Sequence, residues 1–424
     1  MKRKELTFTV KVITPTFMGG GFGQNDSIRP SEIKGLMRYW FRAVAGSIVG
    51  DDIKALKKLE SLVFGSQERR SPFGIVIKYL KEYEEYKLDW NNLEKGVKYL
   101  GFVINMNKER LNNVIKAGSK FEVKFLFKNS VDERIIKLVA YSFYLATALG
   151  GFGLRARRGF GSWQIIDVRT EGIEEKTSKD FEHLKDYDLG KDKIHNIKGI
   201  IEGFKELIKN LTEITNLNRN YNFKTIDENF IYIHRLNSNN WQDVLDNLGN
   251  KYKNFRKIRI NGVFVTPEYY NIRNFISNKC EWDKIRKNQW NFAFGLPIQI
   301  NSREGIPNVL NVPPKRNKRG NIIPTTIGRF KVEHKNDYLE RLPSTVWFSI
   351  KEKNNQYYAI LTYLEGNLFP DENNDKIIFE FDKFLPLNRK CNNPPKSIEV
   401  QYNADELKDK VKSFLRGFNN VRRN

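Results

Sequence analysis

Cysteine and histidine are scarce in this sequence of 424 residues. Cys280 and Cys391 are its only cysteines and form no CxxC pair, so we expect neither a disulfide framework nor a zinc ribbon. None of the four histidines precedes His183, and no two stand at metal-ligand spacing. We therefore expect no metal and no cofactor. The scarcity of cysteine indicates a reducing, hence cytoplasmic, compartment.

Long hydrophobic runs are also missing. No stretch of about 18 apolar residues occurs, so we expect no ordinary membrane-spanning helix and no membrane partner. The N-terminal residues alternate between polar and apolar, whereas a signal peptide needs a continuous apolar stretch. No Gly-x-Ser-x-Gly elbow is present, and no small-molecule substrate site is evident.

Positive charge is abundant by contrast. The chain has 73 Lys plus Arg against 50 Asp plus Glu, which gives a formal net charge of +23. A compact chain with such a surplus repels itself, so an acidic partner is the natural interpretation, and nucleic acid is the commonest one. The alternative is a lysine-rich composition that reflects codon bias and solubility.

The order of expected elements predicts an α+β fold. Alternating residues predict strands at 5–13, 73–80, 98–106, 119–128 and 162–168, and apolar periodicity predicts helices at 30–48, 51–64 and 133–149. This order fits a ferredoxin-type sandwich, in which helices cover one face of an antiparallel sheet.

Two domains are expected from the chain length. The first is predicted at 1–170, followed by a polar linker at 171–194 and a second α+β domain with long insertions at 195–424. Within the second domain we expect a hairpin from strands 347–350 and 357–364. The Asn-rich stretch 213–256 is predicted to be a mobile insertion.

One basic motif lies on the helix predicted after the first glycine-rich loop. Lys34, Arg38 and Arg42 are four residues apart and therefore share one helix face, and Arg29 stands just before the helix. Three stacked cations repel one another unless an anion lies across them, and a phosphodiester backbone would serve. A solvated basic face is the competing interpretation.

The second motif is a glycine-rich segment from Gly150 to Ser162. Its thirteen residues hold five glycines, among them Gly151, Gly153, Gly159 and Gly161, interleaved with Arg155, Arg157 and Arg158. Glycines let a backbone approach a phosphate closely, and arginines add bidentate phosphate contacts. The spacing matches neither a Walker loop nor a dinucleotide fingerprint, and a plain turn is the alternative.

Two segments resemble the RAMP superfamily of CRISPR proteins, and more narrowly the family of first subunits of the type III-B Cmr effector complex. Residues 13–20 match its Thr-Pro-x-Phe-x-Gly-Gly turn, and residues 28–43 match its Arg-Pro-x-x-Ile-Lys-Gly-x-x-Arg-x-Trp-x-Arg helix. Residues 151–161 are similar to the RAMP glycine-rich loop. The resemblance covers about the first 165 residues.

The resemblance implies two ferredoxin-like (RRM-type) domains and a non-catalytic RNA-binding subunit. It implies a place near the 3′ end of the guide RNA, beside other RAMP subunits, where target RNA is captured in antiviral defence. By motif, Arg29, Lys34, Arg38 and Arg42 would line an RNA-facing surface, and the four glycines would shape the loop. The three loop arginines are assigned to RNA from charge alone. The alternative function is a metal-independent endoribonuclease that processes guide-RNA precursors.

Overall fold

The computed structural model divides the chain into two compact units. Unit 1 comprises Met1–Lys251, Val346–Gly366 and Leu415–Asn424, and unit 2 comprises Tyr252–Thr345 and Asn367–Phe414. The structure describes residues 3–19, 25, 27–187, 197–212, 224–236, 238–260, 263–281, 291–294, 299–301, 315–316, 322–323, 326–335, 337–339, 342–368, 372, 374–382, 395–400 and 402–419. Each unit is described by itself.

The N-terminal sheet of unit 1 has the ferredoxin-like order. Its four strands are β1 (Lys4–Val12), β2 (Phe73–Tyr79), β5 (Lys120–Phe127) and β6 (Trp163–Glu171). They pair antiparallel in the order β2-β5-β1-β6, so the first strand lies in the middle of the sheet. Four of the five strands predicted for the first 170 residues are confirmed.

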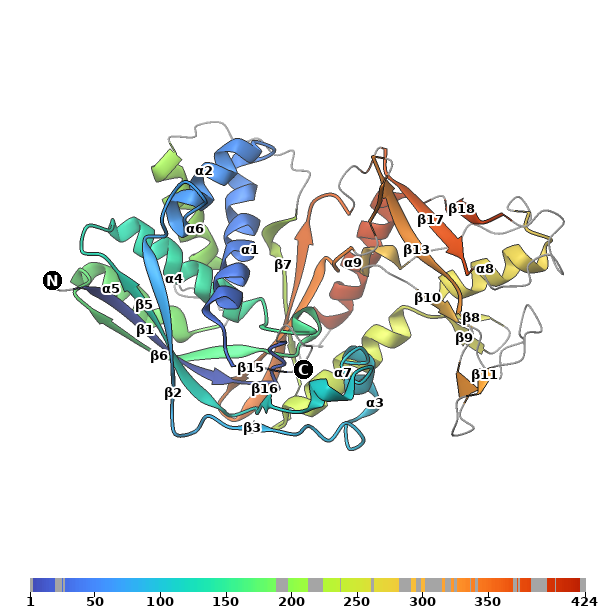
Figure 1. Ribbon diagram of the computed structural model, residues 1–424, viewed down its shortest axis with the longest axis horizontal. Helices are drawn as coiled ribbons and strands as arrows, with labels where there is room; N and C mark the ends of the chain where they lie inside the picture. Colours follow the sequence, from blue (N-terminus) through green and yellow to red (C-terminus); the bar gives the residue numbers. More distant parts are fainter. Residues whose placement is uncertain are drawn as a thin grey trace. The chain divides into compact units, whose positions relative to one another are not determined.

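Helices cover one face of this sheet (Figure 1). They are α1 (Pro30–Val49), α2 (Ile53–Phe64), α4 (Glu133–Ala148) and α6 (Ile197–Thr212). Asp52 caps α2 by accepting a hydrogen bond from the backbone N–H of Ala55 at 2.9 Å. Almost every residue of α4 from Ile135 onward is buried, as its uniformly apolar sequence predicts. The α+β class with helices on one face is therefore confirmed.

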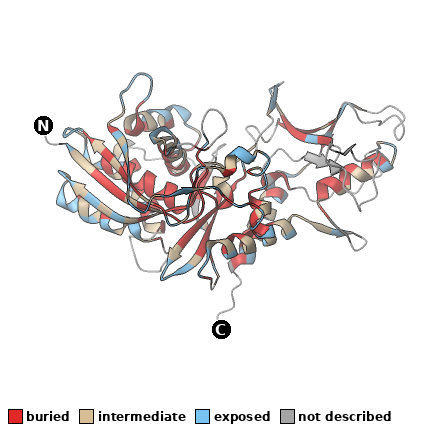
Figure 2. Cartoon of the chain, turned by 60° about the horizontal axis from the view of Figure 1, so that its bottom comes forward, coloured by how far each residue is buried: buried red, intermediate tan, exposed pale blue. Residues whose placement is uncertain are grey.

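The core of unit 1 lies between these helices and the sheet (Figure 2). Aromatic rings dominate its centre. Phe8 of β1 packs edge-on against Phe125 of β5, with ring centres 5.8 Å apart, and Phe143 of α4 contacts both. Such edge-to-face pairs add roughly 0.5–1.5 kcal/mol each beyond simple burial.

The strand predicted at 98–106 is wrong. This region holds the short helix α3 (Lys95–Leu100), followed by turns. Val97, Leu100 and Ile104 are buried, and their spacing is helical rather than alternating. Further short elements nearby are β3 (Glu85–Tyr86), η1 (Lys108–Leu111), β4 (Val114–Ile115) and, after the glycine-rich loop, α5 (Glu175–Phe181) and η3 (Glu182–Lys185).

The second sheet of unit 1 joins distant parts of the chain. Its strands are β7 (Thr225–Arg235), β15 (Val346–Lys353) and β16 (Gln356–Glu365), in the order β15-β16-β7. The predicted hairpin is confirmed, and Asn354 and Asn355 both have positive φ in its two-residue turn. Because this sheet belongs to unit 1, the compact units differ from the predicted division at 171–194.

The stretch predicted as a mobile insertion contains ordered structure. Besides β7, it holds α7 (Trp241–Phe255), which buries Val244, Leu245 and Leu248. The asparagines there obscured apolar residues at helical spacing. Residues 213–223 lie outside the described residues, as do residues 188–194 of the predicted linker.

Unit 2 is built around a five-stranded antiparallel sheet. The path is β10-β13-β17-β18, with β14 paired to β13. Its strands and helices include β8 (Ile258–Ile260), β9 (Val263–Val265), α8 (Pro267–Ser277), η5 (Phe292–Phe294), β10 (Gln299–Asn301), β11 (Lys315–Arg316), β12 (Ile322–Ile323), β13 (Thr326–His334), β14 (Asp337–Leu339), β17 (Lys376–Phe381), β18 (Ser397–Val400) and most of α9 (Ala404–Asn419).

Cys280 departs from the sequence-based expectation. It is disulfide-bonded in the structure rather than solitary. The reducing, cytoplasmic compartment stays a prediction. Among the described residues, no helix is long and apolar enough to cross a bilayer.

Candidate nucleic-acid interface

Arg29 ties the first glycine-rich turn to the start of α1. Its guanidinium donates to the carbonyl oxygen of Gly19 and lies 3.2 Å from the carboxylate of Glu32. Pro30 occupies the first turn of the helix, where the missing N–H costs nothing. Arg29 thus has a structural role at the helix start, although 40% of its side chain remains exposed.

Lys34 is a cation without a carboxylate at ion-pair distance among the described residues. Its ammonium donates to the hydroxyl of Ser71 at 2.7 Å and lies 4.9 Å from the ring centre of Phe73. Burial, and after it the charge of Arg38, lowers the pKa of Lys34. An added anion would relieve the repulsion between these two cations.

Arg38 and Arg42 share one carboxylate. Arg38 contacts Glu60 of α2 at 2.8 Å, and Arg42 lies 3.4 Å from the other oxygen of the same side chain. Arg38 also donates to the carbonyl oxygens of Phe64 and Gly65 at the end of α2. The expected stack of cations waiting for an anion is therefore partly neutralised from within, and Arg38 also holds α2 in place.

The turn after α2 adds two arginines that the sequence analysis missed. Arg69 and Arg70 are exposed on this turn, which Lys34 and Arg38 hold against α1. We call Lys34, Arg38, Arg42, Arg69 and Arg70 the basic face. Its five cations stand against two carboxylates, Glu60 and Glu68, so a net charge of +3 remains. The signal was the pair Arg69-Arg70 shortly before the strand predicted at 73–80.

Gly35 leaves the exposed side of α1 open beside the basic face. A Cβ atom at this position would meet nothing within 4 Å. Glycine in a helix interior costs roughly 0.5–1 kcal/mol relative to alanine, and no packing contact with the described residues requires it here. This open position lies between Lys34 and Arg38 in the sequence, and Tyr39 follows it one helical turn later.

The glycine-rich loop is hydrogen-bonded to the N-terminal turn. The hydroxyl of Thr14 donates to the carbonyl oxygen of Gly159 at 2.7 Å, and the N–H of Leu154 donates to that of Phe17 at 2.9 Å. The two segments of the resemblance, 13–20 and 151–161, thus form one structural unit across residues 13–19 and 151–161.

Two glycines of this loop are required by close backbone contacts. Gly153 has a φ of +82°, and a Cβ there would lie 2.2 Å from the carbonyl oxygen of Phe17. Gly161 has a φ of +64°, and its Cβ would lie 1.8 Å from that of Phe152. These two glycines allow the loop to pack against the protein's own backbone.

The aromatic residues inside the loop belong to the core. Phe152 stacks on Trp163 with ring centres 3.7 Å apart, and Phe160 is fully buried. Neither ring is available to stack on a base.

The three loop arginines have different surroundings. Arg158 is 8% exposed and points at the backbone of β15, so RNA cannot reach it in this conformation. Arg157 lies over the rings of Trp347 and Tyr39, at 4.7 and 5.5 Å. Arg155 faces the other way, toward α3. Tyr39 is therefore where the basic helix and the glycine-rich loop meet.

Side chains of strand β15 donate hydrogen bonds to the glycine-rich loop and to the residues on either side of it. Ser349 donates to the carbonyl oxygen of Gly150 at 2.8 Å. The buried ammonium of Lys351 donates to the carbonyl oxygens of Thr147 at 2.6 Å and Trp163 at 2.9 Å. Burial lowers the pKa of Lys351 well below its usual range. These bonds join residues that are 188 to 204 positions apart in the sequence, so no local sequence pattern predicts them.

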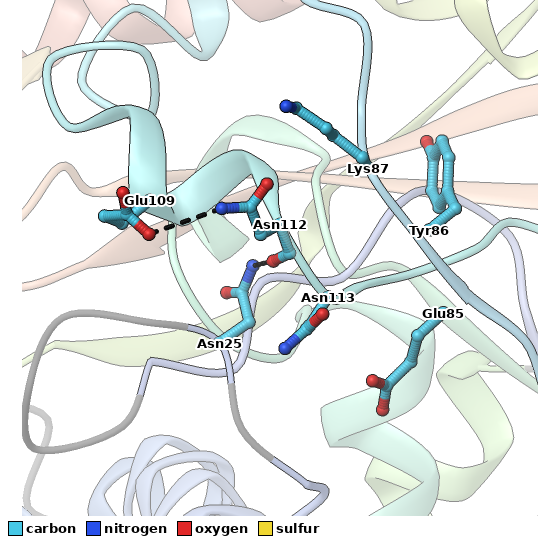
Figure 3. A pocket seen from close by; sticks show the side chains of 7 residues that line it. All are labelled: Asn25, Glu85, Tyr86, Lys87, Glu109, Asn112 and Asn113. Atoms are coloured by element: carbon cyan, nitrogen blue, oxygen red, sulfur yellow. Dashed lines mark hydrogen bonds between the residues drawn. The ribbon is translucent and has the colours of Figure 1, made fainter.

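A polar hollow of about 490 Å³ lies beside β3 and η1 (Figure 3). Asn25 points across it and donates to the carbonyl oxygens of Arg110 and Asn112, at 2.8 and 2.6 Å. The lining holds two carboxylates, Glu85 and Glu109, and one lysine, Lys87, so it suits an anion poorly. Among the described residues, no cluster of three or more His, Cys, Asp or Glu could hold a metal.

Comparison with known proteins identifies the family. The RAMP superfamily pattern matches residues 9–164. The Pyrococcus furiosus protein "CRISPR system Cmr subunit Cmr1-2" is 32% identical over 181 residues, which are 39% of this chain and 97% of that protein. The chain belongs to the RAMP superfamily, in the Cmr1 family.

A second Cmr1 relative and two solved structures agree. "CRISPR system Cmr subunit Cmr1-1" of Pyrococcus furiosus is 32% identical over 238 residues, 55% of this chain and 66% of that protein. The crystal structure of apo Cmr1 from Pyrococcus furiosus aligns over 98% of this chain and 97% of its own, with a TM-score of 0.51 and 20% identity. A chain of the type III-B Cmr-beta complex bound to cognate target RNA aligns over 98% and 100%, with a TM-score of 0.52 and 16% identity. At these identities the structures show a shared fold.

Proposed function

We propose that this Cmr1-family chain is a non-catalytic, RNA-binding subunit of a type III-B CRISPR effector complex. It sits near the 3′ end of the guide RNA, contacts other RAMP subunits and helps to capture target RNA. The relatives are named as Cmr subunits, and one structure of similar fold comes from a complex bound to target RNA. These names support the proposal.

The observation that carries the proposal is the net positive charge of the basic face. Lys34 has no carboxylate partner among the described residues, and Arg42 keeps 49% of its side chain exposed despite its contact with Glu60. Arg69 and Arg70 extend the charge along the adjoining turn. A polyanion bound here releases counterions, which makes the interaction favourable and dependent on salt.

The chemistry of this surface favours binding over cleavage. A metal-independent nuclease needs a general base and an acid beside the scissile phosphate. The basic face consists of lysine and arginine, and histidine is absent from α1, from the turn at 65–71 and from the loop at 150–162. A protonated arginine or lysine can bind phosphate, but it cannot accept a proton as a general base.

The test is a salt titration of RNA binding by the full chain. We expect labelled single-stranded RNA to bind with a steep negative slope of log affinity against log salt. The triple variant Arg42→Gln, Arg69→Gln, Arg70→Gln should flatten that slope by about 2, at roughly 0.7 per lost phosphate contact. The matched control Lys81→Gln, Lys176→Gln, Lys179→Gln removes the same charge from exposed positions on other elements.

Two results would overturn the proposal. Equal slopes for the triple variant and its matched control would mean that only total charge matters. Site-specific cuts in labelled guide-precursor RNA, with or without added Mg²⁺, would instead favour the endoribonuclease. The second assay uses the same purified chain, so both answers come from one preparation.

A further inference from the structure

Phe102 is a large aromatic residue exposed to solvent beside the glycine-rich loop. It is 56% exposed, and Met106, four residues later in the same run of turns, is 75% exposed. The guanidinium of Arg155 lies 5.5 Å from the ring centre of Phe102. Single exposed apolar residues are ordinary, but this ring lies against an arginine and has a second exposed apolar side chain on the same segment.

The side chain of Arg155 and the backbone just before Phe102 are closely packed. The Arg155 side chain donates through Nε to the carbonyl oxygen of Leu100 at 2.7 Å, while its backbone has a left-handed φ of 63°. Gly101 sits so close to the rings of Phe160 and Trp90 that a Cβ there would lie 2.9 Å from each. A non-glycine residue with positive φ is uncommon and tends to mark functional sites. The turn and the loop therefore form one preorganised surface.

We propose that Phe102 and Arg155 form a stacking site for an unpaired nucleobase of single-stranded RNA. This inference rests on the proposed RNA-binding function and adds a base contact to its phosphate contacts. A base can stack on the exposed part of the Phe102 ring while the Arg155 guanidinium attracts the adjoining phosphate. Arg157, two residues on, contacts Tyr39 of α1, so the loop links this site to the helix that carries the basic face.

Charge favours RNA over an apolar protein partner at this surface. The segment 95–111 carries Lys95, Lys98, Lys108 and Arg110 against Glu109 alone, a net charge of +3 before Arg155 is counted. Hydrophobic protein interfaces are depleted of charge at their centre. An aromatic ring interleaved with cations is the pattern of single-strand binding surfaces.

The experiment measures binding of a labelled oligouridine to the full chain. Stacking contributes about 1–3 kcal/mol per base, so Phe102→Ala should weaken binding about 5- to 150-fold. The salt slope should not change, because no phosphate contact is lost. Phe102→Trp should retain the affinity, whereas Phe102→Leu should lose it. Ile53→Ala is the matched control, since Ile53 is also 56% exposed and lies on α2.

The outcomes separate this inference from the proposed function. Affinity that is unchanged in Phe102→Ala overturns the stacking site while leaving the basic face intact. Full affinity in Phe102→Leu shows that an apolar contact suffices, and a variant that binds RNA normally but loses a copurifying protein marks a protein interface; both overturn the inference. If the wild-type chain binds RNA without salt dependence, the proposed function itself is wrong, whatever the result for Phe102→Ala. Thermal unfolding of each variant checks that the fold is kept.

Discussion

The guanidinium of Arg38 donates a hydrogen bond to the carbonyl oxygen of Gly65, 2.7 Å away, just past the end of α2. Arg38 therefore belongs to the basic face and also holds α1 and α2 together. Its neighbour Arg42 contacts the same glutamate but reaches no carbonyl of α2. The two arginines should therefore respond differently to substitution.

Arg38→Ala should lower the free energy of unfolding by about 1–2 kcal/mol, because it frees the oxygens of Phe64 and Gly65 and leaves Glu60 with a single contact. Arg42→Ala should change it by less than about 0.5 kcal/mol, since that side chain is half exposed. Both should weaken RNA binding. Urea unfolding and RNA titration of the two variants check this, and equal stabilities would contradict the assigned roles.

Gly35→Ala should make the protein more stable and a poorer RNA binder. The added methyl meets nothing within 4 Å, so the helix gains about 0.5–1 kcal/mol. A phosphate backbone crossing α1 there would be pushed outward, and we expect several-fold weaker binding. Gly203→Ala in α6 is the control, because its Cβ would make an ordinary 3.8 Å contact with Tyr141. Unchanged RNA affinity in Gly35→Ala would place the RNA elsewhere on the helix.

Gly161→Ala and Gly118→Ala separate backbone strain from collision. Both positions have positive φ, but a Cβ at 161 collides with the Phe152 carbonyl whereas one at 118 meets open space. We expect a loss of about 1 kcal/mol at 118 and of about 3 kcal/mol or more at 161, measured by urea unfolding. Similar losses at both positions would show that the loop can shift to make room.

Lys351 should make stability depend on pH. Its folded-state pKa is lowered by burial, so the unfolded chain binds the proton more tightly and the free energy of unfolding rises with pH. The penalty is constant below the folded pKa and disappears as pH rises toward about 10.4, the ordinary value for lysine. Unfolding below pH 9.5 avoids Tyr187, whose pKa burial raises and whose ring lies 5.2 Å from the ammonium.

Lys351→Met is the matching variant. It should flatten the rise of stability with pH, and it should cost about 1–3 kcal/mol at neutral pH because the carbonyl oxygens of Thr147 and Trp163 lose their donor. The measurement is urea unfolding at several pH values for both proteins. Parallel pH curves would assign the dependence to another group.

The sequence predicted local structure well where one pattern dominated. β1 alternates cleanly, and α4 is apolar on most faces, so both were predicted almost to their ends. The segment at 98–106 failed because its run of apolar residues fits a short helix as well as a strand. Phe102 was accordingly expected inside a strand and was not considered as a site.

The chemistry of the site was predicted only in part. The sequence indicated Lys34, Arg38 and Arg42 on one helix face, and the structure places them there. It could not indicate Glu60, which comes from the next helix, or the burial of Arg158 against β15. Whether a cation faces solvent or a carboxylate depends on tertiary neighbours, which spacing along one helix does not encode.

The hydrogen bonds from β15 to the glycine-rich loop and its flanks matter for translation of the chain and for the design of shorter fragments. During translation, the carbonyl oxygens of Thr147, Gly150 and Trp163 have no donor from β15 until about 200 further residues have been synthesised. A fragment limited to residues 9–164 would carry every motif that marks the superfamily and still lack the strand that completes its loop. Recombinant work should therefore retain residues 346–366, or supply them as a separate peptide.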